Sequence, residues 1–184
     1  VFGVNRILIS FTTTATAVFG AYFKLQSFIF MPVFGLNNGM IPIVAYNYGA
    51  RSKKRIMETV WLSIGIAVGI MLIGLMVFHL MTPQLLMLFQ ADEEMLAIGV
   101  PALRIISLSF LFAGYCIIVG SVFQALGNGV YSLIISVARQ LVCILPLAWF
   151  FARTFGLHAV WLSLPLAEIT SVVLSSILFR KIYL

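Results

Sequence analysis

Long apolar stretches recur along the chain and constrain its fold more than any other feature. A hydrocarbon core of about 30 Å requires about 20 helical residues, and six stretches meet or approach that length. Of the 184 residues, 62% are hydrophobic and 9% are charged, whereas soluble domains carry about 25% charged residues. The sequence therefore predicts an all-α integral membrane protein, a six-transmembrane-helix bundle without a soluble domain.

The expected helices cover residues 1–16, 17–48, 56–81, 95–126, 130–151 and 157–183. The first is short for a span, and Val1 lies inside an apolar run without a signal-peptide pattern, so we expect this helix to be truncated. Short connections predict antiparallel neighbours in one bundle. In the third helix, Gly65 and Gly69 have the spacing that lets two helices pack closely.

The distribution of basic residues predicts the orientation in the membrane. One set of loops carries Arg51, Lys53, Lys54, Arg55, Arg180 and Lys181, and the other carries Arg153 with the acids Asp92, Glu93 and Glu94. Because cytoplasmic loops are rich in Lys and Arg, we expect a multi-pass protein of the cell membrane with a cytoplasmic C-terminus. The net charge of +6 does not indicate nucleic-acid binding, since no basic face interleaved with exposed aromatics is present.

Helix-breaking residues interrupt the second expected helix. They are Pro32, Gly35, Gly39 and Pro42. Proline removes a helical donor and glycine loosens the backbone, so such a segment persists in lipid only where neighbouring helices or a wet cavity satisfy the freed groups. Broken helices of this kind are more typical of transporters than of enzymes.

A polar stripe accompanies these breaks. Lys24, Ser27 and Asn38 share one helical face with Met31, Gly35 and Pro42, because their offsets fall within about 60° at about 100° per residue. We interpret the stripe as the lining of a cavity, while the alternative is that Lys24 extends to the outer membrane interface. Gln124 lies at a Gly/Asn turn, where its side chain could either cap the helix or contact a substrate.

Two further charges lie deep in the membrane. Glu168 is about eleven residues into the sixth helix, about 16 Å at 1.5 Å per residue, and Arg139 is about nine residues into the fifth from the opposite face. They reach comparable depth on adjacent antiparallel helices and could pair directly. A structural ion pair and a role in coupling or gating both fit this placement.

Enzymatic chemistry has little support in the sequence. His79 and His158 are far apart, with no carboxylate at metal-ligand spacing, and no G-x-S-x-G elbow is present. Cys116 and Cys143 lie in apolar runs and are interpreted as small buried hydrophobes. We expect neither an enzyme nor a bound metal or organic cofactor.

Several strings resemble a known family. Gly35-Leu36, Pro42-Ile43-Val44 and Tyr46-Asn47-Tyr48-Gly49-Ala50 resemble the eighth-helix signature of the MATE (multidrug and toxic compound extrusion) family. The similarity continues through Lys24 and the string from Phe123 to Asn128, and more weakly through Gly156-Leu157, Val160-Trp161 and Pro165. It covers essentially the whole chain and is closest to the bacterial drug-export branch.

The resemblance implies the C-terminal half of a twelve-helix secondary active multidrug exporter, driven by H⁺ or Na⁺. Its partners would be a small amphipathic substrate, membrane lipid and an N-terminal lobe, and its lobes would rock to give alternating access. Some members carry acids in the seventh, eighth or tenth helix, where this chain has Arg6, Lys24 and Arg104, so coupling should depend on the N-terminal lobe or on Glu168. The alternatives are a lipid-linked glycan flippase of related fold and a non-transporting membrane assembly subunit.

Overall fold

The computed structural model describes residues 2–183, and its elements within that range are helices. They are α1 (Phe2–Ile9), α2 (Thr13–Gly49), α3 (Lys53–Leu80), α4 (Thr82–Met87), α5 (Glu93–Ser107), α6 (Ser109–Ala125), α7 (Gly129–Val137), the π-helix η1 (Ala138–Ile144), α8 (Leu145–Thr154), α9 (Leu157–Val160) and α10 (Ser163–Tyr183).

Four of these helical segments are long and apolar enough to cross a membrane: α2, α3, the α7–α8 segment Gly129–Thr154 and the α9–α10 segment Leu157–Tyr183. The pair α5 and α6 forms a fifth candidate, bent by 44° at its break. The predicted all-α membrane fold is confirmed. The four continuous spans and the bent pair correspond to the last five expected helices, with ends displaced by a few residues.

The first expected helix, residues 1–16, is wrong in extent. The helix α1 ends at Ile9, and α2 already begins at Thr13. The Thr12 side chain caps α2 by accepting a hydrogen bond from the Thr14 backbone N–H at 3.1 Å. Hydroxyl side chains that bond nearby backbone groups favour such caps over helix interiors, and this explains the break between the two helices.

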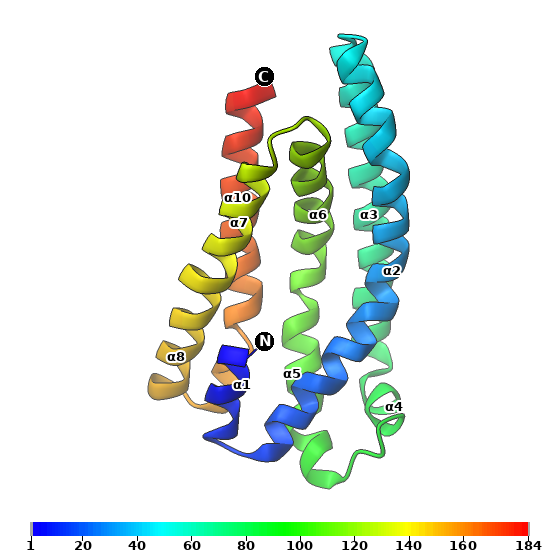
Figure 1. Ribbon diagram of the computed structural model, residues 1–184. Coiled ribbons are helices and arrows are strands. Elements are labelled where there is room, and N and C mark those ends of the chain that lie inside the picture. The colour runs from blue at the N-terminus through cyan, green and yellow to red at the C-terminus, as the bar shows by residue number, and fades with distance from the viewer. Residues whose placement is uncertain (1, 184) are drawn as a thin grey trace.

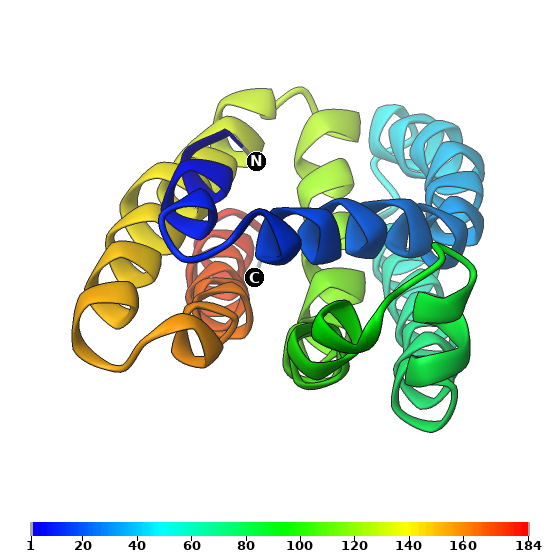
Figure 2. The same cartoon turned by 90° about the horizontal axis from the view of Figure 1, so that it is seen from below.

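The connections alternate between the two ends of the bundle (Figure 1). The α2–α3 turn, the α6–α7 turn and the C-terminal end of α10 lie at one end, and the α1–α2 turn, α4 and the α8–α9 connection lie at the other. The bases from Arg51 to Arg55 therefore lie at the same end as Arg180 and Lys181. Seen along the bundle, the first part of α2 crosses it from α1 towards α3 (Figure 2).

The predicted breaks in α2 are wrong. One continuous helix runs through Pro32 and Pro42, and it bends along its course (Figure 1). A proline removes only one helical hydrogen bond, and both prolines lie on the exposed face of α2, so the rest of the ladder survives the bend. The helices are instead interrupted at Leu108, between α5 and α6, and at η1.

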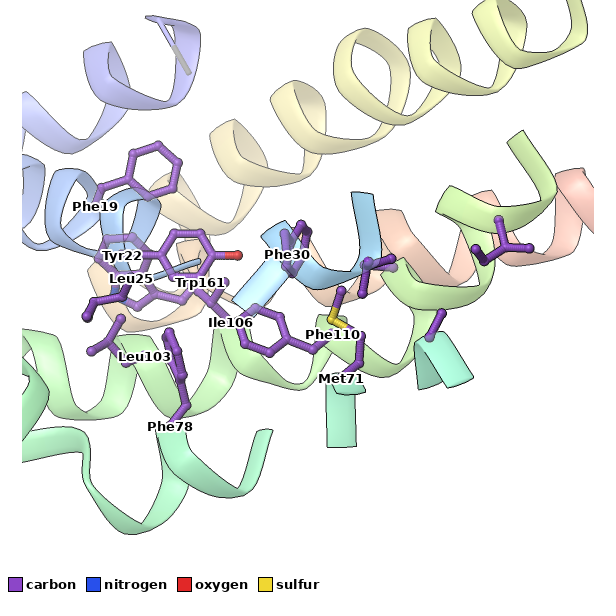
Figure 3. Packing of buried hydrophobic residues seen from close by; sticks show 14 of the residues in the cluster. Phe19, Tyr22, Leu25, Phe30, Met71, Phe78, Leu103, Ile106, Phe110 and Trp161 are labelled. Atoms are coloured by element: carbon purple, nitrogen blue, oxygen red, sulfur yellow. The ribbon is translucent and has the colours of Figure 1, made fainter. Parts of the chain in front are cut away.

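Aromatic rings fix α2 against its neighbours (Figure 3). The ring centroid of Phe110 on α6 lies 5.0 Å from that of Phe78 on α3 and 5.4 Å from that of Phe30 on α2. Phe19 packs on Trp161, at the end of α9, with centroids 6.0 Å apart. Edge-to-face pairs at such distances add stability beyond area burial, so the two pairs made by Phe110 stabilise the contacts among α2, α3 and α6.

Close helix packing occurs at other glycines than predicted. A Cβ added at Gly65 or Gly69 would meet nothing within 4 Å, whereas one at Gly114 would lie 3.0 Å from Met71 Cγ and 3.3 Å from the Ala67 carbonyl oxygen. The α3–α6 contact therefore depends on Gly114. Spacing alone does not say which face of α3 meets a neighbour.

Candidate functional site

A cavity of about 590 Å³ lies between α1, α2, α6, η1 and α10. Its polar residues are Gln26, Ser109, Arg139, Gln140 and Glu168, and Tyr22 adds a hydroxyl. Its apolar wall includes Phe2, Phe19, Phe23, Phe30, Phe34, Ala113, Ile117, Leu141, Ile144, Leu145 and Leu164. The volume and the few polar groups on an aromatic wall are typical of small-molecule sites, which span about 300–1,000 Å³.

The predicted pair of Arg139 and Glu168 is confirmed as a direct contact. Arg139 Nη1 donates a hydrogen bond to Glu168 Oε1 at 3.0 Å, and the two side chains are 26% and 14% exposed. Arg139 Nε and Glu168 Oε2 are buried, and neither has a hydrogen-bond partner among residues 2–183. Buried groups are normally satisfied, so each side of this pair retains bonding capacity beside the cavity.

The π-helix η1 positions Arg139. Pro146 has no backbone N–H and cannot bond the Val142 carbonyl, and the wider turn from Ala138 to Ile144 precedes it. The cavity lining includes Arg139, Gln140 and Ile144 of this π-helix. Single π-turns are frequent at functional sites.

The break between α5 and α6 also borders the cavity. Ser109, the first residue of α6, lines it directly after the 44° bend, and its hydroxyl donates to the Ile106 carbonyl at 2.7 Å. The α5–α6 break and η1 therefore both adjoin the cavity, as broken helices do in transporters, but they are not the breaks predicted in α2.

Lys24, Ser27 and Asn38 are outside this cavity. All three lie on the exposed face of α2, whereas Gln26, Phe30 and Phe34 of the same helix line the cavity. The Lys24 ammonium lies 5.7 Å from the ring centroid of Phe89, in the connection between α4 and α5. These residues do not line this cavity, and the interpretation that their stripe lines a cavity stays a prediction for the exposed face of α2.

The remaining predicted site residues, Gln124 and the four helix-breaking residues of α2, also lie outside the cavity. Gln124 Nε2 donates to Ser132 Oγ at 3.1 Å, so Gln124 connects α6 to α7 away from the cavity. Pro32, Gly35, Gly39 and Pro42 all lie on exposed parts of α2. Arg6 lines a smaller cavity of about 310 Å³ with Trp149 and Arg153.

The sequence reasoning missed Gln26, Ser109 and Gln140. The two glutamines could have been predicted from the sequence. A long polar side chain within an apolar span is costly unless it faces a partner or water, so each glutamine indicates a polar surrounding. Ser109 could not have been predicted in this way, since a lone serine in a span commonly bonds the backbone of its own helix.

This fold and cavity define a multi-pass helical membrane protein whose polar cavity lies within one bundle. The MatE family model matches residues 2–150, and the chain belongs to this family. The resemblance found in the sequence is confirmed.

The relatives are drug exporters by name. The multidrug export protein MepA of Staphylococcus haemolyticus (strain JCSC1435) is 28% identical over 165 residues, which cover 90% of this chain and 36% of that protein. MepA of Staphylococcus aureus (strain MSSA476) is 27% identical over 168 residues, with the same shares. The chain thus spans 36% of the length of these relatives.

Solved structures share the fold. A MOP superfamily transporter from Pyrococcus furiosus, described as having a binding pocket of reverse polarity, matches with a TM-score of 0.92 and 23% identity over 99% of this chain and 42% of its own. The outward-facing and inward-facing conformations of a multidrug resistance MATE family transporter each match with a TM-score of 0.92 and 22% identity. Each match covers 99% of this chain. It covers 42% of the outward-facing structure and 43% of the inward-facing structure.

Proposed function

We propose that this chain is the C-terminal lobe of a secondary active multidrug exporter, which exchanges small amphipathic compounds for H⁺ or Na⁺ across the cell membrane. The cavity beside Arg139 and Glu168 carries this proposal. An amphipathic compound would place its apolar part on the phenylalanine wall. Its polar groups would lie beside the Arg139–Glu168 pair and the side chains of Gln26 and Gln140, which line the cavity.

The ion pair offers a means of coupling. While Glu168 is ionised, its charge balances that of Arg139 at 3.0 Å. A proton or Na⁺ on Glu168 would leave the arginine charge uncompensated, and in a low-dielectric cavity this charge would repel an organic cation. Ion and cationic substrate would then exclude one another, which is the requirement for antiport.

The exposed face of α2 would meet the N-terminal lobe or the aqueous cleft between the lobes. Ser27 and Asn38 are exposed there, and polar side chains within a membrane rarely face lipid. The equal match to outward-facing and inward-facing structures, both at a TM-score of 0.92, supports movement of this lobe as one unit. The bases grouped at the C-terminal end support a cytoplasmic C-terminus.

The test uses the full-length transporter with paired substitutions. Glu168→Gln should reduce export of a fluorescent organic cation at least about fivefold, the lower range of typical coupling energies. Arg139→Met combined with Glu168→Leu removes both charges, which is often neutral for stability, and it should also abolish export at wild-type membrane abundance. Wild-type export by this double variant would make the pair structural and overturn the proposal.

The two alternatives fit less well. A glycan flippase is expected to have a strongly cationic cavity, whereas Arg139 is balanced here by Glu168. An assembly subunit is expected to have a closed core and a fully paired Glu168, whereas Glu168 Oε2 has no partner among the described residues and borders a cavity of about 590 Å³.

A further inference from the structure

A further cavity, the basic-end groove, lies where α2 ends, α3 begins and α10 ends. Its volume is about 330 Å³. It is lined by Tyr48, Arg51, Lys53, Ile56, Met57, Leu126, Phe179, Ile182 and Tyr183. It shares no lining residue with the cavity beside Arg139 and Glu168, so it is a separate feature of the lobe.

The groove has an apolar floor and basic residues beside it. Its floor is apolar, with Met57 half-buried and Phe179 buried, while Arg51 and Lys53 are exposed. No acid is among its lining residues, and no ion pair involves these two bases within residues 2–183. The adjacent Lys54, by contrast, pairs with Glu58 at 3.9 Å. Two uncompensated positive charges beside an apolar floor complement an anionic amphiphile.

Surrounding aromatic residues place the groove at the depth of lipid head groups. Tyr46 and Tyr48 at the end of α2 are 75% and 55% exposed, and Trp61, two turns into α3, is 58% exposed. Exposed Tyr and Trp collect at membrane–water interfaces. The bases would therefore meet phosphate groups while the apolar floor faces the hydrocarbon region.

The turn between α2 and α3 holds Arg51 in an uncommon conformation. Its φ is 56°, in the left-handed region that non-glycine residues rarely adopt. The Arg51 and Ser52 backbone N–H groups donate to the carbonyls of Tyr48 and Asn47, each at 3.0 Å. This hydrogen-bonded turn fixes the backbone from which Arg51 reaches the groove.

We propose that the basic-end groove binds an anionic phospholipid of the cytoplasmic leaflet. The lipid phosphate lies against Arg51 and Lys53, and the first part of an acyl chain lies against Met57 and Phe179. Basic pockets between helices on the cytoplasmic side suit such head groups, and each base near the membrane surface contributes measurably to their attraction.

The experiment measures lipid-dependent thermal stabilisation of the delipidated full-length transporter in detergent. Phosphatidylglycerol is titrated against phosphatidylcholine with the same acyl chains, and inorganic phosphate is added as a third probe. Phosphatidylglycerol should raise the melting temperature more than phosphatidylcholine does. Phosphate alone should not raise it, because it cannot occupy the apolar floor.

Variants separate the groove from general surface charge. Arg51→Asn with Lys53→Gln removes both lining bases, and Asn tolerates the left-handed turn. This variant should need about 25-fold more phosphatidylglycerol for half-maximal stabilisation, about fivefold per base. Lys54→Gln with Arg55→Gln removes two charges from the first turn of α3, outside the groove, and this variant should respond like wild type. Met57→Trp fills the floor, keeps both bases and should also weaken the response.

Four results would overturn the proposal. They are equal stabilisation by the two lipids, full stabilisation by phosphate alone, an equal loss in the Lys54/Arg55 control, and no response of the wild-type protein. The last is the result expected if the N-terminal lobe covers the groove.

Discussion

At the scale of single residues, Gly114 shows where the lobe tolerates no added side chain. Gly114→Val would push against Met71 and the Ala67 backbone, and overpacking of this kind costs about 1–3 kcal/mol. We expect a lower melting temperature of the full-length protein in detergent.

Gly65→Val is the matched control for this prediction, since a side chain at Gly65 enters open space. It should leave the melting temperature near the wild-type value. Equal destabilisation by both substitutions would contradict the assignment of the α3–α6 contact to Gly114.

Helix geometry predicted the contact of Arg139 with Glu168, but it did not predict that Lys24 lies outside the cavity beside this pair. The fixed rise of a helix sets the depth of a residue in the membrane, and matching depths on neighbouring helices predicted the pair. Periodicity says which residues share a face, but it does not say which face turns inward. In α2 the aromatic face with Gln26 and Phe30 turns to the cavity, and the Lys24 face turns outward.

At the scale of elements, η1 is the feature that most directly shapes the site. Pro146→Ala restores the missing backbone donor and permits a regular helix. A register change of one residue rotates side chains by about 100° and would separate Arg139 from Glu168. We expect reduced export at unchanged membrane abundance.

Pro101→Ala is the control for this substitution, because Pro101 also lies inside a helix, α5, and is not among the cavity-lining residues. It should retain export. Normal export by Pro146→Ala would mean that the π-turn has no part in positioning Arg139.

The membrane spans were easier to predict from the sequence than the breaks, bends and π-turns within them. Apolar length predicted α2, α3 and the α7–α8 segment, because only hydrophobic helices satisfy the lipid environment. The consequences of proline were not predictable from its presence, since Pro32 and Pro42 leave α2 continuous while Pro146 follows a π-turn. Packing against neighbouring helices decides between these outcomes.

At the scale of the whole molecule, residues 2–183 form one helical bundle with three cavities, of which two carry the proposals above. The larger one contains the ion pair, and the basic-end groove lies at the end where the bases collect. The chain spans 36% of the length of its relatives, and the N-terminal lobe proposed above would lie beside the exposed face of α2.

Thiol labelling can show whether the cavity beside Arg139 and Glu168 contains water and holds a substrate. In a full-length transporter with Cys116 and Cys143 replaced by alanine, Gln140→Cys places a thiol on the cavity wall. Leu133→Cys, on the exposed face of α7, is the matched lipid-facing control. We expect a membrane-impermeant thiol reagent, applied to the purified protein, to label Cys at position 140 and not at 133. An exported compound should slow the labelling at position 140. Equal labelling at both positions, or labelling at position 140 that the compound leaves unchanged, would contradict a wet, substrate-holding cavity beside Arg139 and Glu168.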